Sequence, residues 1–233
     1  MKMTHMKSLY QLTFLPGFFP VNCYFVEEED GLTLIDAALP YSAKAILEAA
    51  GKIGKPITRI LLTHAHGDHV GALDNLKETL QDVPVYISER DARLLRGDVS
   101  LDKNEPDTPI RGGVPKSLKT REDFTLKDGD RAGSLLCIST PGHTPGSMSF
   151  LDTRSRTLIA GDALQIRGGI AVSGKVRPLF PFPAMGTWNK QVSIESAEKL
   201  AACEPAILAV GHGKLLQTPA EAMRRAIEAA RER

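Results

Sequence analysis

The first third of the chain alternates short apolar runs with segments of helical spacing. Residues 21–26 and 32–35 are apolar and are separated by a polar turn at 28–31, which predicts a β-hairpin. Ser42 then opens a segment whose apolar residues lie three and four positions apart and which stops near Gly54. This spacing is typical of a helix packed on one face.

A His-rich segment follows the next apolar run. Residues 57–62 predict a buried strand, residues 63–69 read T-H-A-H-G-D-H, and the apolar positions within 70–80 predict one helix. The His-rich segment is therefore predicted to be a loop between a strand and a helix. After a further strand at 83–87, Ser88 is expected to cap a short helix that Gly97 ends.

The remainder of the chain contains two long irregular stretches between short strands. Residues 98–119 lack periodicity and predict a surface loop over an active site, and residues 165–187 are irregular and rich in Gly, Pro and apolar residues. The other expected elements are strands from 124 and at 135–139, 148–151, 157–160 and 206–210, a helix at 187–200, and a last helix opened by a T-P-A-E capping box at 218–221.

Two parts of the chain resemble each other. YFVEEEDGLTLIDAAL at 24–39 is similar to SFLDTRSRTLIAGDAL at 149–164, and the run 60–64 is echoed at 207–212. We interpret these similarities as a diverged internal duplication within a single domain of residues 1–233, with halves of about 1–97 and 120–233. Each half would supply one sheet. Chance similarity between short apolar strands that precede polar turns is the alternative.

Composition narrows the classes of partner. The formal net charge is +1, so the chain has no broad basic field for nucleic acid and no basic amphipathic face for a membrane. No apolar run approaches the roughly 20 residues that span a bilayer, and the N-terminal residues lack the apolar middle of a secretory signal. We expect a cytoplasmic protein with a small-molecule substrate. The three scattered cysteines suggest neither a disulfide framework nor a thiolate zinc site.

The His-rich loop is the main chemical clue. It places three imidazoles and one carboxylate within six residues, a donor set that suits zinc, iron or manganese. One ion cannot conveniently take all four. His64 and His66 can point into one site, whereas Asp68 and His69 can turn toward a second site because Gly67 leaves the backbone free.

Four motifs in order extend this clue to nearly the whole chain. They are H-x-H-x-D-H after an apolar strand, P-G-H-T-P-G-S at 141–147, L-I-A-G-D at 158–162 and G-H-G at 211–213. In this order they resemble the metallo-β-lactamase superfamily. The resemblance implies an α/β fold, a four-layer αβ/βα sandwich with two mixed β-sheets, flanking helices and metals at one edge of the sheets.

The resemblance also assigns the ligands. It implies that a first ion is held by His64, His66 and His143, a second by Asp68, His69 and His212, and that Asp162 bridges the two. We expect two divalent ions, Zn²⁺ ahead of Fe or Mn. Such a pair would supply a bridging hydroxide near neutral pH and polarise the scissile bond. Asp68 is expected to be catalytic as well, orienting the hydroxide and passing a proton to the leaving group.

Departures from the family pattern reduce the number of substrate classes that we expect. Asp162 stands where many zinc β-lactamases carry a cysteine, and too few residues follow His212 for the helical domain that glyoxalase II enzymes use. Acyl-homoserine lactonases share this ligand set in a compact domain. We therefore expect hydrolysis of an ester, lactone or thioester. The alternatives are a phosphodiesterase or nuclease of the same fold, an iron-dependent oxidoreductase similar to persulfide dioxygenases, and a binding protein without catalysis.

Other residues allow two interpretations. Apolar side chains in loops either wall a substrate pocket or pack under the loops, and cationic side chains in loops either meet an anionic substrate or are solvated. Asp36 matches Asp162 in the internal comparison and is expected to hydrogen-bond to a ligand rather than to bind metal. His5 is expected to lie in a frayed N-terminus. The apolar group comprises Phe18, Phe19, Leu179, Phe180, Phe182, Met185 and Trp188, and the cationic group Arg111, Lys116, Arg167, Lys175 and Arg177.

Overall fold

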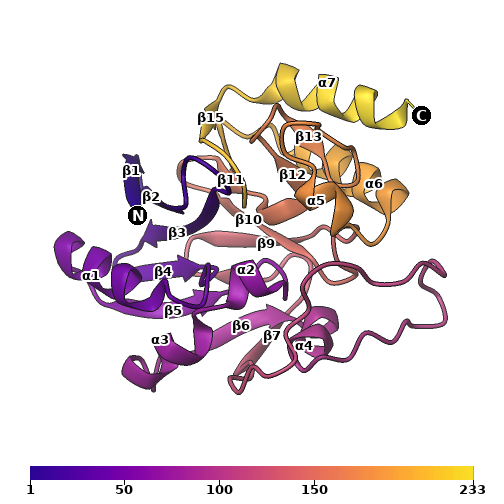
Figure 1. Ribbon diagram of the computed structural model, residues 1–233. Helices are drawn as coiled ribbons and strands as arrows, with labels where there is room; N and C mark the ends of the chain where they lie inside the picture. Colours follow the sequence, from indigo (N-terminus) through magenta and orange to yellow (C-terminus); the bar gives the residue numbers. More distant parts are fainter. Residues whose placement is uncertain (233) are drawn as a thin grey trace.

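Two β-sheets packed face to face, with helices on both outer faces, form the molecule (Figure 1). The structure is a computed structural model that describes residues 1–232. The first sheet has the strand order β1-β2-β3-β4-β5-β6-β7 and the second β15-β14-β11-β10-β9-β8, and a small pair β12-β13 stands apart.

The strands have the following bounds: β1 Lys2–Met6, β2 Leu9–Phe14, β3 Val21–Glu27, β4 Leu32–Ile35, β5 Ile57–Leu61, β6 Val85–Ser88, β7 Phe124–Leu126, β8 Arg131–Ala132, β9 Leu135–Ser139, β10 Met148–Asp152, β11 Thr157–Ile159, β12 Leu164–Gln165, β13 Ala171–Val172, β14 Ile207–Ala209 and β15 Leu216–Gln217. The α-helices have these bounds: α1 Ala43–Ile53, α2 Gly67–Val70, α3 Leu73–Thr79, α4 Glu89–Leu95, α5 Phe182–Met185, α6 Lys190–Ala202 and α7 Ala220–Arg231. A 3₁₀ turn, η1, covers Gly161–Ala163.

Both sheets are mixed. In the first, β1 to β4 pair antiparallel and β4 to β7 pair parallel. In the second, β8 to β11 pair antiparallel, β11 pairs parallel with β14, and β14 pairs antiparallel with β15. The predicted α/β fold with two mixed sheets and flanking helices is confirmed.

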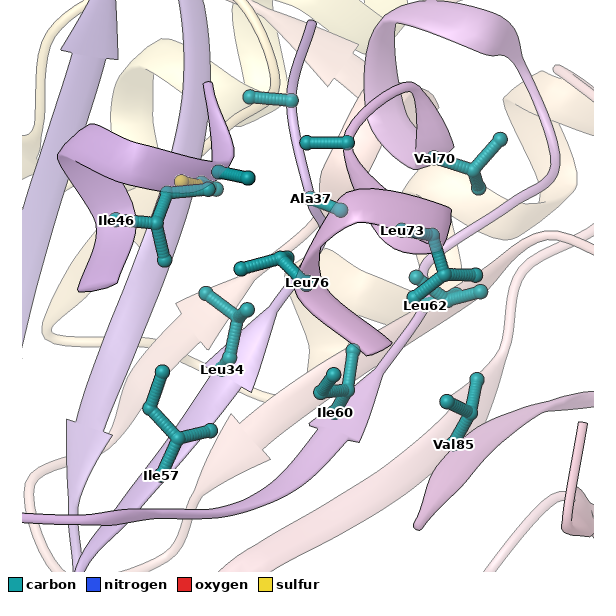
Figure 2. Packing of buried hydrophobic residues seen from close by; sticks show 14 of the residues in the cluster. Leu34, Ala37, Ile46, Ile57, Ile60, Leu62, Val70, Leu73, Leu76 and Val85 are labelled. Atoms are coloured by element: carbon teal, nitrogen blue, oxygen red, sulfur yellow. The ribbon is translucent and has the colours of Figure 1, made fainter. Parts of the chain in front are cut away.

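Three apolar clusters separate the four layers. The inner cluster joins the two sheets, with Tyr24 and Leu61 of the first meeting Phe150 and Ile159 of the second. A second cluster packs the other face of the first sheet against α1 to α4, and Figure 2 shows Leu34 and Ile60 of the sheet facing Ile46 and Leu76 of the helices. A third packs the second sheet against α6 and α7. Successive residues of a strand therefore serve different layers, as the two-residue period of a strand requires.

The two sheets share a local order of strands. In the first, the antiparallel pair β3 and β4 is followed by the parallel strand β5, with Ile35 opposite Leu61. In the second, β10 and β11 are followed by β14, with Ile159 opposite Ala209. The strand pairs that the internal comparison matched thus occupy like positions. That the two halves arose by duplication stays a prediction.

The expected frayed start is wrong. Residues 2–14 form the β1-β2 hairpin, with Lys2 opposite Thr13, and this hairpin continues into the first sheet. β1 is an edge strand whose side chains are largely exposed, so it shows little hydrophobic alternation and its conformation depends on pairing with β2. His5 is exposed and its ring stacks on Tyr10 at 4.1 Å between centroids.

The single helix expected after the His-rich loop is two short helices, α2 and α3. The break occurs at Gly71, whose N–H donates to Ala38 O at 2.9 Å in place of the carbonyl one turn earlier. A Cβ at Gly71 would lie 2.6 Å from Gly67 O and 2.7 Å from Pro40 Cδ. Contact with the end of the first sheet therefore interrupts a segment with continuous helical spacing.

Two predicted helix starts are also wrong, whereas one is confirmed. Ser88 caps α4 as expected, accepting from Asp91 N at 3.1 Å. Helix α6 begins after Asn189, whose Oδ1 accepts from Val192 N at 3.0 Å, rather than at Thr187. At α7 no capping box forms, because Thr218 has φ +46° and its N–H is used by Ala206 O at 2.9 Å.

The two irregular stretches differ in structure. Residues 98–119 contain no helix or strand, as predicted, whereas 165–187 include strand β13 and the short helix α5.

No helix within residues 1–232 has both the length and the apolar character needed to cross a membrane.

Candidate metal centre

The loops at one edge of the two sheets bring all seven predicted ligand residues together. The His-rich loop follows β5, residues 141–147 connect β9 to β10, η1 follows β11, and His212 follows β14. Six of the seven side chains are buried, and only Asp68 is partly exposed, at 28%. β11 and β14 pair parallel and therefore deliver the residues that follow them to one edge of the second sheet, and the residues that follow β5 of the first sheet meet them there.

The side chains form two sets around a shared carboxylate. The three-histidine set is His64, His66 and His143, and the mixed set is Asp68, His69 and His212; in each, the potential ligand atoms lie within 4.8 Å of one another. The Asp162 carboxylate lies between the sets. Its Oδ2 is 3.4 Å from His143 Nε2 and 3.2 Å from His212 Nε2, and its Oδ1 is 3.5 Å from His69 Nε2.

Hydrogen bonds outside the cluster orient two of the imidazoles. Asp36 accepts from His69 Nδ1 at 2.8 Å and from the Thr63 hydroxyl at 2.8 Å. Since Thr63 Oγ1 donates to Asp36, it can accept from His64 Nδ1 at 3.0 Å. Both histidines then turn Nε2 to the interior of the cluster. Asp36 has the hydrogen-bonding position that the sequence suggested, and its φ of +61° is part of that placement.

The other three imidazoles are also held from behind. His212 Nδ1 donates to Pro20 O at 2.7 Å, and His143 Nδ1 contacts Ser173 Oγ at 2.9 Å. His66 is reversed, because its Nε2 donates to Arg111 O at 2.9 Å and leaves Nδ1 facing inward. An imidazole held by its other ring nitrogen is the usual arrangement of a metal ligand in proteins.

The cluster fits divalent cations. His64 Nε2, His69 Nε2 and Asp162 Oδ1 are buried and have no hydrogen-bond partner, and unsatisfied buried polar atoms are costly. His66 Nδ1 and His143 Nε2, two inward-facing acceptors, are 2.9 Å apart. A cation between these lone pairs would satisfy both, and imidazole with carboxylate is a common donor set for zinc and iron.

The two sets differ electrostatically. Burial holds the pKa of His64, His66 and His143 below the ordinary histidine value. Burial also acts to lower the pKa of His69, but the carboxylates of Asp162 and Asp36 outweigh it and raise the value to about 10. In the metal-free chain the three-histidine set is therefore neutral at pH 7, whereas the mixed set carries protons.

The same balance acts on His212 and Asp162. Burial would lower the pKa of His212, but its contact with the Asp162 carboxylate raises it. Burial would raise the pKa of Asp162, but His212 and His69 hold it well below the usual range. A cation bound here would therefore replace protons that the metal-free cluster holds.

Two glycines permit the close packing of the cluster. A Cβ at Gly211 would lie 2.0 Å from Asp162 Oδ1 and 2.7 Å from His69 Cε1. A Cβ at Gly112, which has φ +88°, would lie 2.4 Å from His66 Cε1 and Nε2. The loop 98–119 thus lies directly against a predicted ligand, and Gly67 N donates to Gly113 O at 2.8 Å beside it.

A pocket of about 210 Å³ opens onto the cluster. Both irregular loops contribute to it, Gly112 and Gly113 from the first and Pro183 and Gly186 from the second, and Phe19 and Phe182 form aromatic walls with ring centroids 5.0 Å apart. The two interpretations of the apolar loop residues therefore both apply. Phe19 and Phe182 wall the pocket, and Phe180 and Trp188 are buried packing residues.

The cationic loop residues do not line this pocket. Arg167 donates to Gly17 O at 2.8 Å and Arg177 donates to Ile170 O at 3.1 Å through Nε. Arg111, Lys116 and Lys175 are also absent from the pocket lining, although the Arg111 carbonyl holds His66. These five side chains are therefore not among the residues that line the pocket beside the cluster.

Sequence reasoning missed several residues that support the cluster. Asp91 is fully buried and accepts hydrogen bonds from residues next to ligands, but in the sequence it is only an acidic residue in the first turn of a helix. The Arg111 carbonyl and Ser173 lie in irregular stretches without a local signal. Gly112 precedes Gly113, and a Gly-Gly pair was the one available hint of a close backbone approach.

Comparison with known proteins agrees with this geometry. A family model of the metallo-beta-lactamase superfamily matches residues 16–212, and the chain belongs to that superfamily. The chain is 60% identical over 231 residues to the uncharacterized protein YobT of Bacillus subtilis, covering 99% of both chains. It is 34% identical over 214 residues to the probable metallo-hydrolase YflN of the same organism, covering 82% of this chain and 80% of that one.

One more distant relative and one solved structure indicate the chemistry found among similar proteins. The crystal structure of TTHA1623 in a di-iron-bound form has a TM-score of 0.67 and 29% identity, covering 91% of this chain and 96% of that one. A hydroxyacylglutathione hydrolase of Gloeobacter violaceus is 29% identical over 147 residues, which are 61% of this chain and 49% of that protein. The fold and the candidate metal-binding cluster thus belong to a superfamily that includes metallo-hydrolases.

Proposed function

We propose that this protein is a two-metal hydrolase of a small ester, lactone or thioester with an apolar acyl group. The observation that carries the proposal is the pocket above the seven donors. Phe19, Phe182 and Pro183 line it together with glycine backbone, and no Lys or Arg is among its lining residues. Such walls suit an uncharged acyl group and offer no partner for a phosphoryl group or a carboxylate.

The size of the pocket supports a small reacting group. About 210 Å³ accommodates the bond to be cleaved and a short stretch of chain. Phe18, adjacent to Phe19, and Met185, in the same helical turn as Phe182, are 80% and 64% exposed. These side chains could contact the distal part of an acyl chain, and each buried CH₂ would contribute about 0.8 kcal/mol.

Named relatives support hydrolysis of an acyl compound. YflN is called a probable metallo-hydrolase, and the name hydroxyacylglutathione hydrolase denotes cleavage of an acyl derivative of glutathione. The present chain spans about half of the latter protein. We therefore take the acyl chemistry from this likeness and leave the glutathione moiety aside.

The seven donor residues would have the following roles. His64, His66 and His143 would hold one divalent ion, Asp68, His69 and His212 the other, and Asp162 would lie between them. Two bound cations, for which we propose Zn²⁺, lower the pKa of a water and polarise a carbonyl oxygen. Asp68 is the one carboxylate of the cluster that is partly exposed, and its Oδ2 is 3.4 Å from His212 Nε2. It is placed to orient the attacking water and to pass a proton to the leaving group.

A substrate panel tests the proposal. Metal-loaded wild type would be assayed on lactones, thioesters, carboxyl esters, phosphodiesters and β-lactams, beside Asp68→Asn and the control Asp74→Asn. Asp74 is an acidic residue of the neighbouring helix that accepts hydrogen bonds from Thr120 and Lys119 outside the pocket. We expect turnover of acyl substrates that falls by about 10²–10⁴-fold in Asp68→Asn, the usual weight of an acid-base group, and stays near wild type in Asp74→Asn.

Two results would contradict it. One is faster turnover of phosphodiesters than of any acyl substrate. The other is about one iron per chain in protein purified without added metal, together with oxygen consumption on a persulfide, which would make the protein an oxidoreductase.

A further inference from the structure

A buried carboxylate outside the metal cluster joins the two loops that carry the three-histidine set. Asp91 lies in the first turn of α4 and is 0% exposed. Its Oδ2 accepts from Ala65 N at 3.0 Å and from Thr144 Oγ1 at 2.7 Å, and its Oδ1 accepts from Gly146 N at 2.8 Å. All three donors are neutral.

The positions of these donors connect two layers. Ala65 stands between His64 and His66 in the loop after β5 of the first sheet. Thr144 and Gly146 follow His143 in the loop between β9 and β10 of the second sheet. One carboxylate therefore spans the interface between the sheets at the point where three imidazoles must meet. Asp91 itself is not part of any group of potential ligand atoms.

Close packing leaves this bridge little freedom. Ser88 Oγ donates to Gly146 O at 2.6 Å while it caps the helix through Asp91 N, so the helix start and the Gly146 backbone are joined twice. A Cβ on Gly146 would lie 2.5 Å from Asp91 N. The loop of His143 is thus seated on the N-terminal turn of α4.

Burying the Asp91 carboxylate costs free energy of folding, and a residue with a purely structural role would not need this cost. Among residues 1–232 no Lys or Arg side chain reaches within 4.0 Å of its carboxylate, so the charge is buried without a salt bridge, and buried unpaired charges destabilise a fold. An asparagine of the same size has a single acceptor oxygen and an NH₂ group that would face one of the donors. Oδ2 alone joins the two loops and Oδ1 adds a second bond to the His143 loop, so only a carboxylate can accept from all three donors without turning an NH₂ group toward one of them.

We propose that Asp91 is a positioning residue that sets the distance between the His64–His66 loop and the His143 loop and so preorganises the three-histidine set for a metal ion. It acts through the Ala65 and Thr144 neighbours of the ligands rather than by contact with the metal. The inference rests on the metal site of the proposed function but not on its substrate.

The test uses Co²⁺ as the probe, because its visible absorption reports ligand geometry. Asp91→Asn would be compared with wild type for Co²⁺ affinity, by competition with a chromophoric chelator, and for the Co²⁺ spectrum. Asp152→Asn is the matched control. Asp152 is also a buried carboxylate, 2% exposed, but it accepts from Ser8 Oγ at 2.7 Å and Arg154 Nε at 3.0 Å, far along β10 from the metal loops.

We expect Asp91→Asn to lose about 10–100-fold in affinity for the first ion, the range found when a partner behind a ligand is removed, and to give an altered Co²⁺ spectrum. Asp152→Asn should keep the wild-type affinity and spectrum even if its melting temperature falls. If Asp91→Asn does not fold, Thr144→Val removes one of the three hydrogen bonds and should shift affinity and spectrum in the same direction by less.

Two results would overturn the inference. The first is a wild-type affinity and Co²⁺ spectrum in a folded Asp91→Asn or, where that variant does not fold, in Thr144→Val. The second is an equal loss in Asp152→Asn, which would reduce the role of Asp91 to general stability. A wild-type chain that binds no Co²⁺ would instead overturn the metal site of the proposed function itself.

Discussion

The three-histidine set and the mixed set lie side by side, yet they are prepared for a cation in opposite ways. In the three-histidine set, burial together with the neighbouring imidazoles holds the pKa of His64, His66 and His143 below the ordinary histidine value, and His66 Nδ1 and His143 Nε2 already face one another. In the mixed set, carboxylates around His69 and His212 raise their pKa, so the metal-free cluster holds itself together through protonated imidazoles.

This difference concerns which interactions a cation replaces. At the three-histidine set, a cation would bind between two ring nitrogens that already face each other, and no hydrogen bond to a carboxylate must be broken first. At the mixed set it must displace protons that are paired with carboxylates. The carboxylates compensate, because they place negative charge beside a divalent cation. The two sets, which border one pocket, are thus expected to bind metal with different dependence on pH.

The largest expected effect comes from removing the carboxylate that both sets share. Asp162→Asn removes the charge between His143 and His212, which lie 3.4 Å and 3.2 Å from its Oδ2. We expect metal content to fall from two ions to about one and kcat/KM on the best acyl substrate to fall by about 10³-fold or more, about 4 kcal/mol. Elemental analysis and steady-state kinetics measure both. Two bound ions with activity within tenfold of wild type would show that the sets are independent.

A smaller effect should follow from disturbing the three-histidine set alone. In Gly112→Ala the new Cβ would meet His66 at 2.4 Å, on a backbone with φ +88° that disfavours alanine. We expect the affinity of the three-histidine set for Co²⁺ to fall by about 10–100-fold with little change in the mixed set. Gly113→Ala is the control on the same loop, since a Cβ there meets nothing within 4 Å. Equal losses in both variants would mean that loop flexibility, not contact with His66, was changed.

The most modest effect is a difference in proton release. His69, with a pKa of about 10, is protonated at pH 7 and must lose its proton before its nitrogen can bind metal. We therefore expect binding at the mixed set to release about one to two protons, and its affinity to rise by roughly tenfold per pH unit for each proton as pH increases toward 10. Binding at the three-histidine set should release almost none. Titration calorimetry at pH 7 in buffers of different ionisation enthalpy measures both numbers, and equal release at the two sets would remove the contrast.

Local sequence was a good guide where burial and spacing act over a few residues. The hairpin of β3 and β4, helix α1 ending at Gly54, strand β5 and the Ser88 cap all follow from short-range patterns. It failed where a long-range contact decides the outcome. Helix α3 is separated from α2 because Gly71 bonds to Ala38, and Thr218 does not cap α7 because its N–H bonds to Ala206.

The sequence by itself determined the donors of the candidate site, because density of imidazole and carboxylate in one loop, together with the ordered motifs, is a local property of the chain. Only the tertiary structure decided how those donors are held. Asp36 lies 33 residues along the chain from its partner His69, Asp91 lies 26 residues from Ala65, and the Arg111 carbonyl lies 45 residues from His66. Their roles depend on the packing of two sheets and a loop, and no spacing along the chain records which of many buried polar groups that packing will bring into contact.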